Sequence, residues 1–159
     1  MSSAILDIQC VIGADSIYLI KEMSVLDTDS WASQHWIFKH SSKTQTAKTR
    51  CVNKWLLRNY HQLSLECGNV QYEELEPILN SLNFKTIYVK GEQKEKMIKQ
   101  FIPNVEIVNM EEIGCPRLNQ LICDNIESPP CCIHHMYLSK KQCTFYKVFM
   151  LKKWYIQNS

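Results

Sequence analysis

The sequence predicts an α/β domain in which a mixed five-stranded sheet is flanked by helices, and three observations lead to this fold class. The chain opens with three extended segments joined by short links, which favours an antiparallel meander. Its hydrophobic residues then change to the spacing of amphipathic helices. Two later apolar segments each follow a helical pattern, as expected for strands reached through helical crossovers. Because 159 residues suit one core, we expect a single domain over residues 1–159.

The three extended segments are defined by their apolar and β-branched residues. Residues 4–12 are mostly apolar, and residues 16–26 alternate roughly between apolar and polar side chains. The intervening Gly13–Asp15 supplies a hairpin turn. The third segment, His35–Phe38, combines aromatic and β-branched side chains, which favour a strand.

The rest of the chain alternates between helical patterns and short strands. The expected elements are, in order, a helix over 46–60, a helix over 72–82, a strand over 85–89, a helix between Gly91 and Pro103 and a fifth strand over 105–108. Residues 111–130 contain Gly114 and several prolines and are expected to be irregular. A last helix is expected to begin near Ser139, where Gln142 three residues later fits a capping box.

The composition is typical of a globular protein. Hydrophobic residues make up 45% and charged residues 21% of the chain, and the formal net charge of +2 argues against a strong overall field. No apolar run approaches the ~20 residues that span a bilayer. The first residues lack the basic region of a signal peptide, so we expect no membrane association and a cytoplasmic or nuclear location. The eight cysteines are then expected to be reduced thiols or metal ligands.

The last third of the chain carries a spacing typical of a structural zinc site, Cys115-x16-Cys132-x2-His135-x7-Cys143. Structural zinc takes four thiolate or imidazole ligands in a tetrahedron. Cys132 and His135 would form a chelating pair. Cys143 would lie at the first turn of the last helix, where the positive helix end favours a thiolate. Cys115 lies in a turn that could supply the fourth ligand. The site would order the segment 115–143, since a long loop is otherwise hard to order.

Other assignments of these ligands stay open at the level of sequence. Cys131 and His134 have the same spacing, shifted by one residue, and Cys123 could replace Cys115. The alternative to a metal is a set of buried thiols, because free cysteine is commonly buried.

The C-terminal region is locally basic. After Glu127 the chain has no acidic residue, and the lysines that follow are Lys140, Lys141, Lys147, Lys152 and Lys153. A basic surface at this end could attract phosphate groups, and the alternative is a solvated helix face.

Several segments resemble the motifs of DEDDh 3′–5′ exonucleases. Ile5–Gln9 resembles their first motif, an apolar strand that carries Asp-x-Glu. His61–Leu63 is similar to their His-Gly-Ile segment, and Ile87–Val89 to the strand that ends in their second acidic motif. Cys143–Val148 lies where that family has His-x4-Asp at its last helix. The resemblance implies an RNase H-like fold, which also has three antiparallel strands followed by two crossover strands.

The acidic residues of that family are mostly missing from this chain. Asp7 remains, but the partner position of the first motif is Gln9, and Lys90 stands near the second acidic position. Cys143 replaces the general-base histidine, and Val148 replaces the last aspartate. Two-metal phosphodiester hydrolysis needs several carboxylates that hold cations about 4 Å apart. We therefore expect no two-metal exonuclease activity and assign no catalytic residue.

A degenerate domain of this kind is the Maelstrom domain of germline small-RNA pathway proteins. It combines an RNase H-like fold, lost acidic residues and a Cys/His zinc site near the last helix, and the order of the predicted ligands here is similar. The resemblance implies a structural zinc and binding of RNA, in particular single-stranded RNA, or of another nucleic acid. It implies a small-RNA, transposon or virus-related context. The expected phosphate contacts are Lys90, in place of a metal-bridged contact, and Lys140, Lys141 and Lys147.

Two other functions fit the same sequence. The domain could keep its fold only as a scaffold for protein partners, in which case it would not bind nucleic acid in a salt-sensitive way. It could also be a ribonuclease with a non-standard, metal-independent active site.

Overall fold

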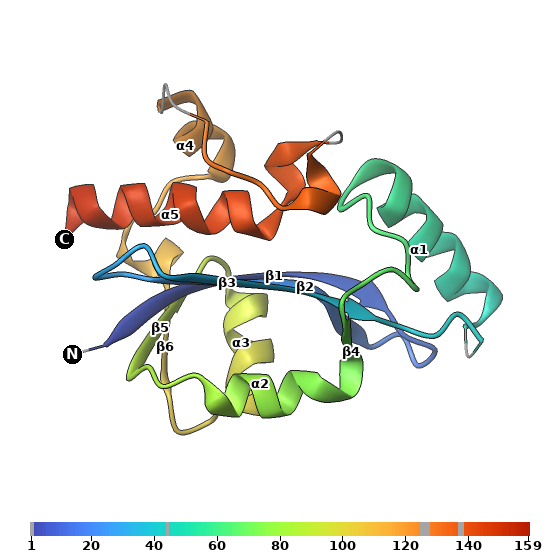
Figure 1. Ribbon diagram of the computed structural model, residues 1–159. Helices are drawn as coiled ribbons and strands as arrows, with labels where there is room; N and C mark the ends of the chain where they lie inside the picture. The colour runs from blue at the N-terminus through green and yellow to red at the C-terminus, as the bar shows by residue number, and fades with distance from the viewer. Residues whose placement is uncertain (1, 44, 125–127, 137–138) are drawn as a thin grey trace.

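The computed structural model describes residues 2–43, 45–124, 128–136 and 139–159, which form one mixed sheet with helices on both faces (Figure 1). The strands are β1 (Ser3–Ile12), β2 (Tyr18–Asp27), β3 (Ser33–Lys39), β4 (Val70–Gln71), β5 (Thr86–Val89) and β6 (Glu106–Asn109). The α-helices are α1 (Ala47–Asn59), α2 (Leu75–Ser81), α3 (Glu92–Phe101), α4 (Leu118–Asp124) and α5 (Thr144–Asn158). The short 3-10 helices are η1 (Tyr72–Glu74), η2 (Met110–Ile113), η3 (Ile133–His135) and η4 (Lys140–Gln142).

The sheet has six strands in the order β4-β3-β2-β1-β5-β6. Strands β1, β2 and β3 are antiparallel neighbours, whereas β5 runs parallel to β1 and β6 runs parallel to β5. The predicted α/β class, the mixed sheet and the antiparallel meander are therefore confirmed. The predicted number of five strands is wrong, because β4 adds a two-residue parallel strand at the outer edge of β3. Two residues are too few to show a periodic pattern in the sequence.

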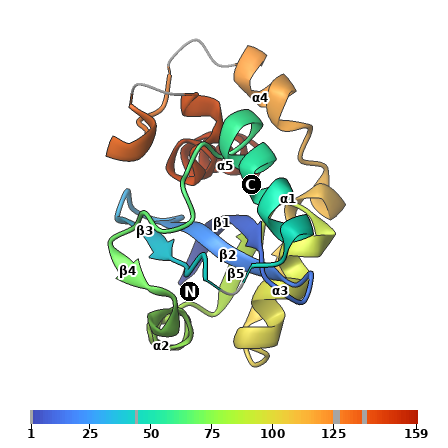
Figure 2. The same ribbon diagram turned by 90° about the vertical axis from the view of Figure 1, so that its right-hand side faces the viewer.

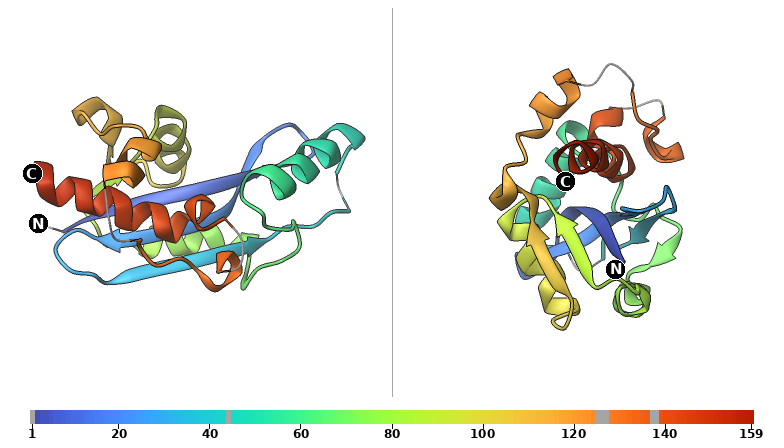
Figure 3. Two further views of the ribbon diagram at one scale, coloured as in Figure 1. Left: turned by 90° about the horizontal axis from the view of Figure 1, so that it is seen from above. Right: turned by 90° about the vertical axis from the view of Figure 1, so that its left-hand side faces the viewer.

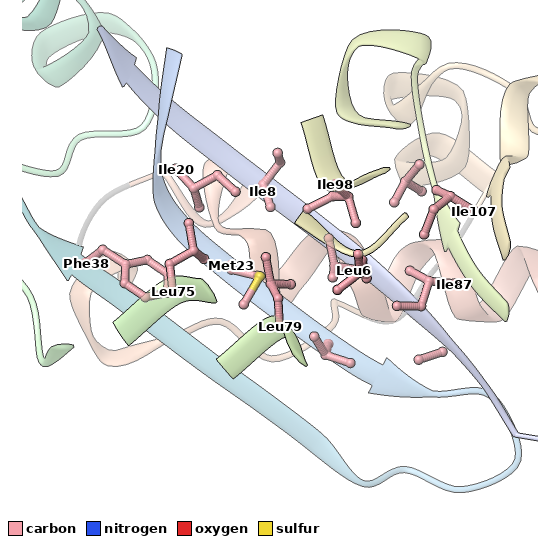
Figure 4. Packing of buried hydrophobic residues seen from close by; sticks show 14 residues of the cluster. Leu6, Ile8, Ile20, Met23, Phe38, Leu75, Leu79, Ile87, Ile98 and Ile107 are labelled. Carbon is pink, nitrogen blue, oxygen red and sulfur yellow. The ribbon is translucent and has the colours of Figure 1, made fainter. Parts of the chain in front are cut away.

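The period-2 alternation of β1 sends its side chains to two different layers. Leu6 and Ile8 belong to the main core, which α2 and α3 cover (Figure 4). Ile5 belongs to a second core, which contains Val148 and Leu151 of α5. Figures 1 and 2 show α5 on one side of the sheet and α2 and α3 on the other. The polar positions of β1 consequently lie on the same side of the sheet as α5.

Helix α5 lies along β1 and β2, and α1 lies beyond its first turn, as the view from above shows (Figure 3). The predicted capping box at its start is wrong. Ser139 precedes the separate 3-10 helix η4, and its side chain makes no capping hydrogen bond. Helix α5 begins only at Thr144, whose backbone N–H is capped by the carboxylate of Glu22 from the sheet, at 3.1 Å. No sequence motif near the helix could predict a cap that comes from a strand.

The segment 111–130 was predicted to be irregular, but much of it is helical. The 3-10 helix η2 ends at Gly114, whose φ of +94° is the left-handed conformation typical of a glycine at a helix end. Helix α4 follows at Leu118 and packs against α5. Both elements have seven residues or fewer, so they show less than two turns of periodic pattern. Residues 125–127 of the same segment lie outside the described part of the chain.

The long connection between α1 and β4 is held against the sheet by a buried lysine. The ammonium group of Lys21 on β2 donates hydrogen bonds to the carbonyl oxygens of Phe38 at 2.8 Å, Leu65 at 2.9 Å and Cys67 at 2.5 Å. Burial lowers the pKa of Lys21 to about 8. Gly68 passes so close to β3 that a Cβ atom there would lie 2.6 Å from the Ile37 carbonyl oxygen. The connection is thus held in place against β2 and β3.

Among the helices in the described part of the chain, none is both long and apolar enough to cross a membrane. All eight cysteines are free thiols.

Candidate metal centre and the adjoining lysine pocket

Four side chains from distant parts of the chain converge beside the start of α5. They are Glu22 of β2, His35 of β3, Cys132 and Cys143, and their ligand atoms all lie within 4.8 Å of one another. Carboxylate, imidazole and thiolate are all ligands of divalent metals in proteins. This group, together with His135 beside it, is called the metal centre below, and it could hold a metal ion.

The distances around Glu22 define the metal centre. Its Oε2 atom lies 3.7 Å from the Sγ atoms of both Cys132 and Cys143. The Nδ1 atom of His135 lies 3.6 Å from the same oxygen and 3.1 Å from the Cys132 Sγ atom. His35 differs, because its Nε2 atom lies only 2.7 Å from Oε2, which is a hydrogen-bond distance.

The other carboxylate oxygen of Glu22 serves the fold. Oε1 accepts hydrogen bonds from the side-chain amide of Gln9 at 2.8 Å and from the backbone N–H of Thr144 at 3.1 Å. Gln9 also donates to the carbonyl oxygen of Gln142, immediately before α5. These bonds fix the orientation of the carboxylate, so that Oε2 faces the cysteines.

The histidine and cysteine of the 132–143 segment are also oriented by hydrogen bonds. The Nε2 atom of His135 donates to the backbone carbonyl of His61 at 2.7 Å. Since Nε2 carries the hydrogen, the free lone pair of the ring is on Nδ1, which faces the centre. The Sγ atom of Cys143 accepts a hydrogen bond from the backbone N–H of Cys132 at 3.3 Å. Such support of metal ligands by outer hydrogen bonds is typical of metal sites.

The electrostatics of the metal centre favour a cation. A hydrogen bond from Cys132 lowers the pKa of the Cys143 thiol to about 5, although burial opposes this. Burial acts to raise the pKa of Glu22, but the hydrogen bond from His35 and the nearby His135 outweigh it and hold that pKa below its usual value. A buried thiolate and a buried carboxylate therefore lie side by side. Buried anions are stable only when they are paired or coordinate a metal.

Three of the four zinc ligands expected from the sequence meet at this centre, and the fourth does not. Cys132, His135 and Cys143 are neighbours. Cys115 lies instead in the second core with Met110, and its Sγ atom donates to the carbonyl oxygen of Pro116 at 3.6 Å. Glu22, more than 100 residues earlier in the chain, lies beside these three residues instead. The alternative ligands are less suited, because Cys123 and His134 are exposed.

Glu22 was missed because chain spacing cannot show a ligand supplied by a distant strand. The one sequence signal is an acidic residue inside a strand pattern that also contains the apolar residues Ile20 and Met23. Glu22 is fully buried, as are Ile20 and Met23. A charged residue with an apolar environment of this kind is almost never buried without a partner.

The lysines predicted to contact phosphate fall into two groups. Lys140 and Lys141 of η4 are exposed. Lys147 is buried, with its Nζ atom 5.4 Å from the centre of the Tyr60 ring. Lys152, counted with the basic surface, is buried as well and donates to the backbone carbonyls of Asp27 and Ser30. Only some of the lysines of the predicted basic surface are therefore exposed to solvent.

The fourth predicted phosphate contact, Lys90, lies in a pocket on the α5 side of β1. This Asp7 pocket is lined by Asp7, Tyr60, Lys90, Lys94, Glu111, Leu118, Lys147 and Leu151. Lys94 forms an ion pair with Asp7 at 2.5 Å, and Lys90 forms one with Glu111 at 2.9 Å. An ammonium group thus lies against each carboxylate. In the described part of the chain, the side chains around Asp7 do not form a group of three metal-binding residues.

No protein-family model matches this chain, and no curated protein matches it in sequence.

His61 links the α1–β4 connection to the metal centre and predicts a pH dependence of folding. Its Nδ1 atom accepts a hydrogen bond from the backbone N–H of Leu63, and burial together with the charge of Lys21 lowers its pKa to about 4. The unfolded chain protonates this histidine near pH 6.5. The unfolded state therefore binds more protons between about pH 6.5 and 4, and stability falls as the pH decreases through this window.

The variant His61→Asn keeps an acceptor for the Leu63 N–H but has no titrating group. We expect it to lose less stability than the wild type between pH 7 and pH 4.5, by about 2 kcal/mol. Urea unfolding of both proteins at the two pH values measures this difference. An equal loss in both proteins would contradict the assignment of the titration to His61.

Proposed function

We propose that this chain is a zinc-stabilised, catalytically degenerate nuclease-like domain that binds RNA or another nucleic acid. The observation that carries the proposal is the metal centre together with the Asp7 pocket, in which Lys94 pairs with Asp7 and Lys90 pairs with Glu111. The sheet order supports an RNase H-like fold, because β5 and β6 extend the sheet in parallel from the first strand of an antiparallel meander.

Zinc is the metal that the donor set fits best. Two thiolates and an imidazole are typical ligands of zinc, which is usually four-coordinate and tetrahedral in structural sites and also accepts a carboxylate. Bond lengths of about 2.0–2.3 Å place tetrahedral ligand atoms about 3.3–3.8 Å apart. The Oε2 atom of Glu22 lies 3.6–3.7 Å from the ligand atoms of Cys132, His135 and Cys143. These separations support a quartet of these four residues.

His35 is better suited to an outer role than to ligation. Its distance of 2.7 Å to the Glu22 carboxylate is too short for two atoms that share a tetrahedral metal but fits a hydrogen bond. Its imidazole would therefore orient Glu22, as outer residues commonly orient ligating carboxylates.

Zinc in this place would have a structural role. It would join the sheet through Glu22, the segment before α5 through Cys132 and His135, and the start of α5 through Cys143. The hydrogen bond from His135 to the His61 carbonyl, and that from the Ser139 N–H to Gln62, would extend the same connection to the loop after α1. With four protein ligands, no open position remains on the metal for chemistry.

The proposed nucleic-acid contacts are Lys140 and Lys141 on the surface, with Lys90 and Lys147 in the Asp7 pocket. Single-stranded RNA is the preferred partner, and the cytoplasm or nucleus is the proposed location. The ion pairs of Lys94 and Lys90 support the absence of two-metal catalysis, because each occupies a carboxylate that a divalent cation would need.

The zinc assignment predicts the metal content of matched variants. Elemental analysis of the purified chain is expected to find about one zinc per chain. Glu22→Gln, His135→Ala and Cys143→Ser are expected to lose the metal and much of their stability, because binding free energy is folding free energy at such a site. Cys115→Ser serves as the matched control that keeps it. Loss of zinc in Cys115→Ser, with retention in Glu22→Gln, would overturn the proposed quartet.

The nucleic-acid assignment predicts a change in salt dependence. For a labelled single-stranded RNA, removal of the two ammonium groups in Lys140→Ala/Lys141→Ala is expected to reduce the slope of log affinity against log salt by about 0.7 for each phosphate that is no longer neutralised. The control is Lys85→Ala/Lys99→Ala, two exposed lysines outside η4 and α5. Fluorescence anisotropy at several salt concentrations measures both. Absence of salt-sensitive binding in the wild type would favour a protein-interaction scaffold.

A further inference from the structure

The Asp7 pocket holds more positive charge than its carboxylates neutralise. Three lysines, Lys90, Lys94 and Lys147, line it together with two acidic residues, Asp7 and Glu111. Two of the lysines are used in ion pairs. Among the ion pairs of the described residues, Lys147 takes part in none, and its Nζ atom lies over the face of Tyr60. The cavity, of about 190 Å³, is therefore suited to an anionic group.

The charged form of Lys94 is secured by its environment. Burial acts to lower the pKa of this lysine, but the charge of Asp7 and the hydrogen bond to it outweigh burial and raise that pKa above its usual value. The ammonium group lies 2.5 Å from Oδ1 of Asp7. It occupies one side of the carboxylate, so a divalent cation could bind there only by displacing it.

The second carboxylate oxygen of Asp7 is suited to accept a hydrogen bond from a hydroxyl group of a ligand. Asp7 is 1% exposed, and its Oδ2 atom has no hydrogen-bond partner among the described protein groups. A buried acceptor without a donor costs about 1–3 kcal/mol, so the unpartnered oxygen of this pocket-lining residue favours a ligand that supplies a donor. An anionic oxygen of a phosphate would be repelled by Oδ2, whereas a hydroxyl group would donate to it.

An apolar groove continues from the pocket. A second cavity shares Tyr60 and Lys94 with the Asp7 pocket and is lined further by Tyr18, Leu56 and Met97. Tyr18 and Tyr60 are 48% and 40% exposed. Aromatic side chains beside lysines are the combination that stacks bases of single-stranded nucleic acids while binding their phosphates.

We propose that the Asp7 pocket and this groove bind one ribonucleotide unit without a divalent metal. The ammonium groups of Lys147 and Lys90 bind the phosphate, Oδ2 of Asp7 accepts a ribose hydroxyl, and the base lies in the groove against Tyr60 and Tyr18. The inference rests on the proposed binding of RNA and names the place where one of its nucleotides is bound. Lys94 holds the Asp7 carboxylate in position through its ion pair, and its ammonium group takes the place of the cation that a carboxylate in a nuclease would bind.

The experiment is a titration of the full chain with 5′-AMP, monitored by NMR or calorimetry. A chelator that is too weak to remove a four-ligand zinc is present, so that no other divalent cation can take part in binding. Binding of 5′-AMP is expected to persist in the chelator. It is expected to be about tenfold weaker for 2′,3′-dideoxy-AMP, which lacks the ribose hydroxyls, and about tenfold weaker for adenosine, which lacks the phosphate. Lys147→Met is expected to weaken the binding of 5′-AMP by a similar factor, while the binding of adenosine stays unchanged. Lys99→Met is the matched control.

The variant Asp7→Asn tests the hydroxyl contact, and it is expected to bind 5′-AMP and its dideoxy analogue with nearly equal affinity.

If Lys147→Met fails to fold, the half-buried Lys90→Met takes its place. Binding of a labelled RNA separates the two proposals. RNA binding that is salt-sensitive but unchanged by Lys147→Met or Lys90→Met, with no binding of 5′-AMP, would overturn the ribonucleotide site and leave the proposed function intact. Absence of all RNA binding in the wild type would instead contradict the proposed function itself.

Discussion

The carboxylate of Glu22 is the interaction on which the rest of this structure depends. One oxygen caps the first turn of α5 and receives the amide of Gln9, and the other faces two cysteines and two histidines. A single buried charge thus connects the middle of the sheet, the start of the last helix and the segment before it. Because an unpaired buried carboxylate would be very costly, its partners must be present for this side of the molecule to form.

The two candidate sites lie on the same side of the sheet and are built from adjacent strands. Asp7 and Gln9 are two residues apart on β1, and Gln9 is paired in register with Glu22 on β2. Asp7 is bound by the ammonium group of Lys94, whereas Gln9 donates its side-chain amide to Glu22. These two polar side chains of β1 therefore support the two sites, Asp7 in the lysine pocket and Gln9 at the metal centre.

Local patterns in the sequence predicted most of the fold. The features that these patterns did not predict depend on contacts between segments far apart in the chain. The meander, the crossover helices and the last helix follow from residue periodicity, and three residues of the metal centre follow from chain spacing. Glu22 could not be predicted from spacing, since its role arises only when β2 lies beneath α5. The same contact explains the failed capping box at Ser139. Lys147 and Lys152 were counted as surface charge, because composition does not show that a long side chain can be buried with its ammonium against a ring or a carbonyl.

The most direct test of the central role of Glu22 is X-ray absorption at the zinc edge on the purified protein, because it identifies the ligand atoms themselves. We expect two sulfur atoms at about 2.3 Å and two nitrogen or oxygen atoms at about 2.0–2.1 Å, from Cys132, Cys143, His135 and Glu22. A shell with three sulfur atoms would place a further cysteine at the metal and remove Glu22 from its central role. A shell of nitrogen and oxygen alone would mean that the zinc is bound elsewhere on the protein.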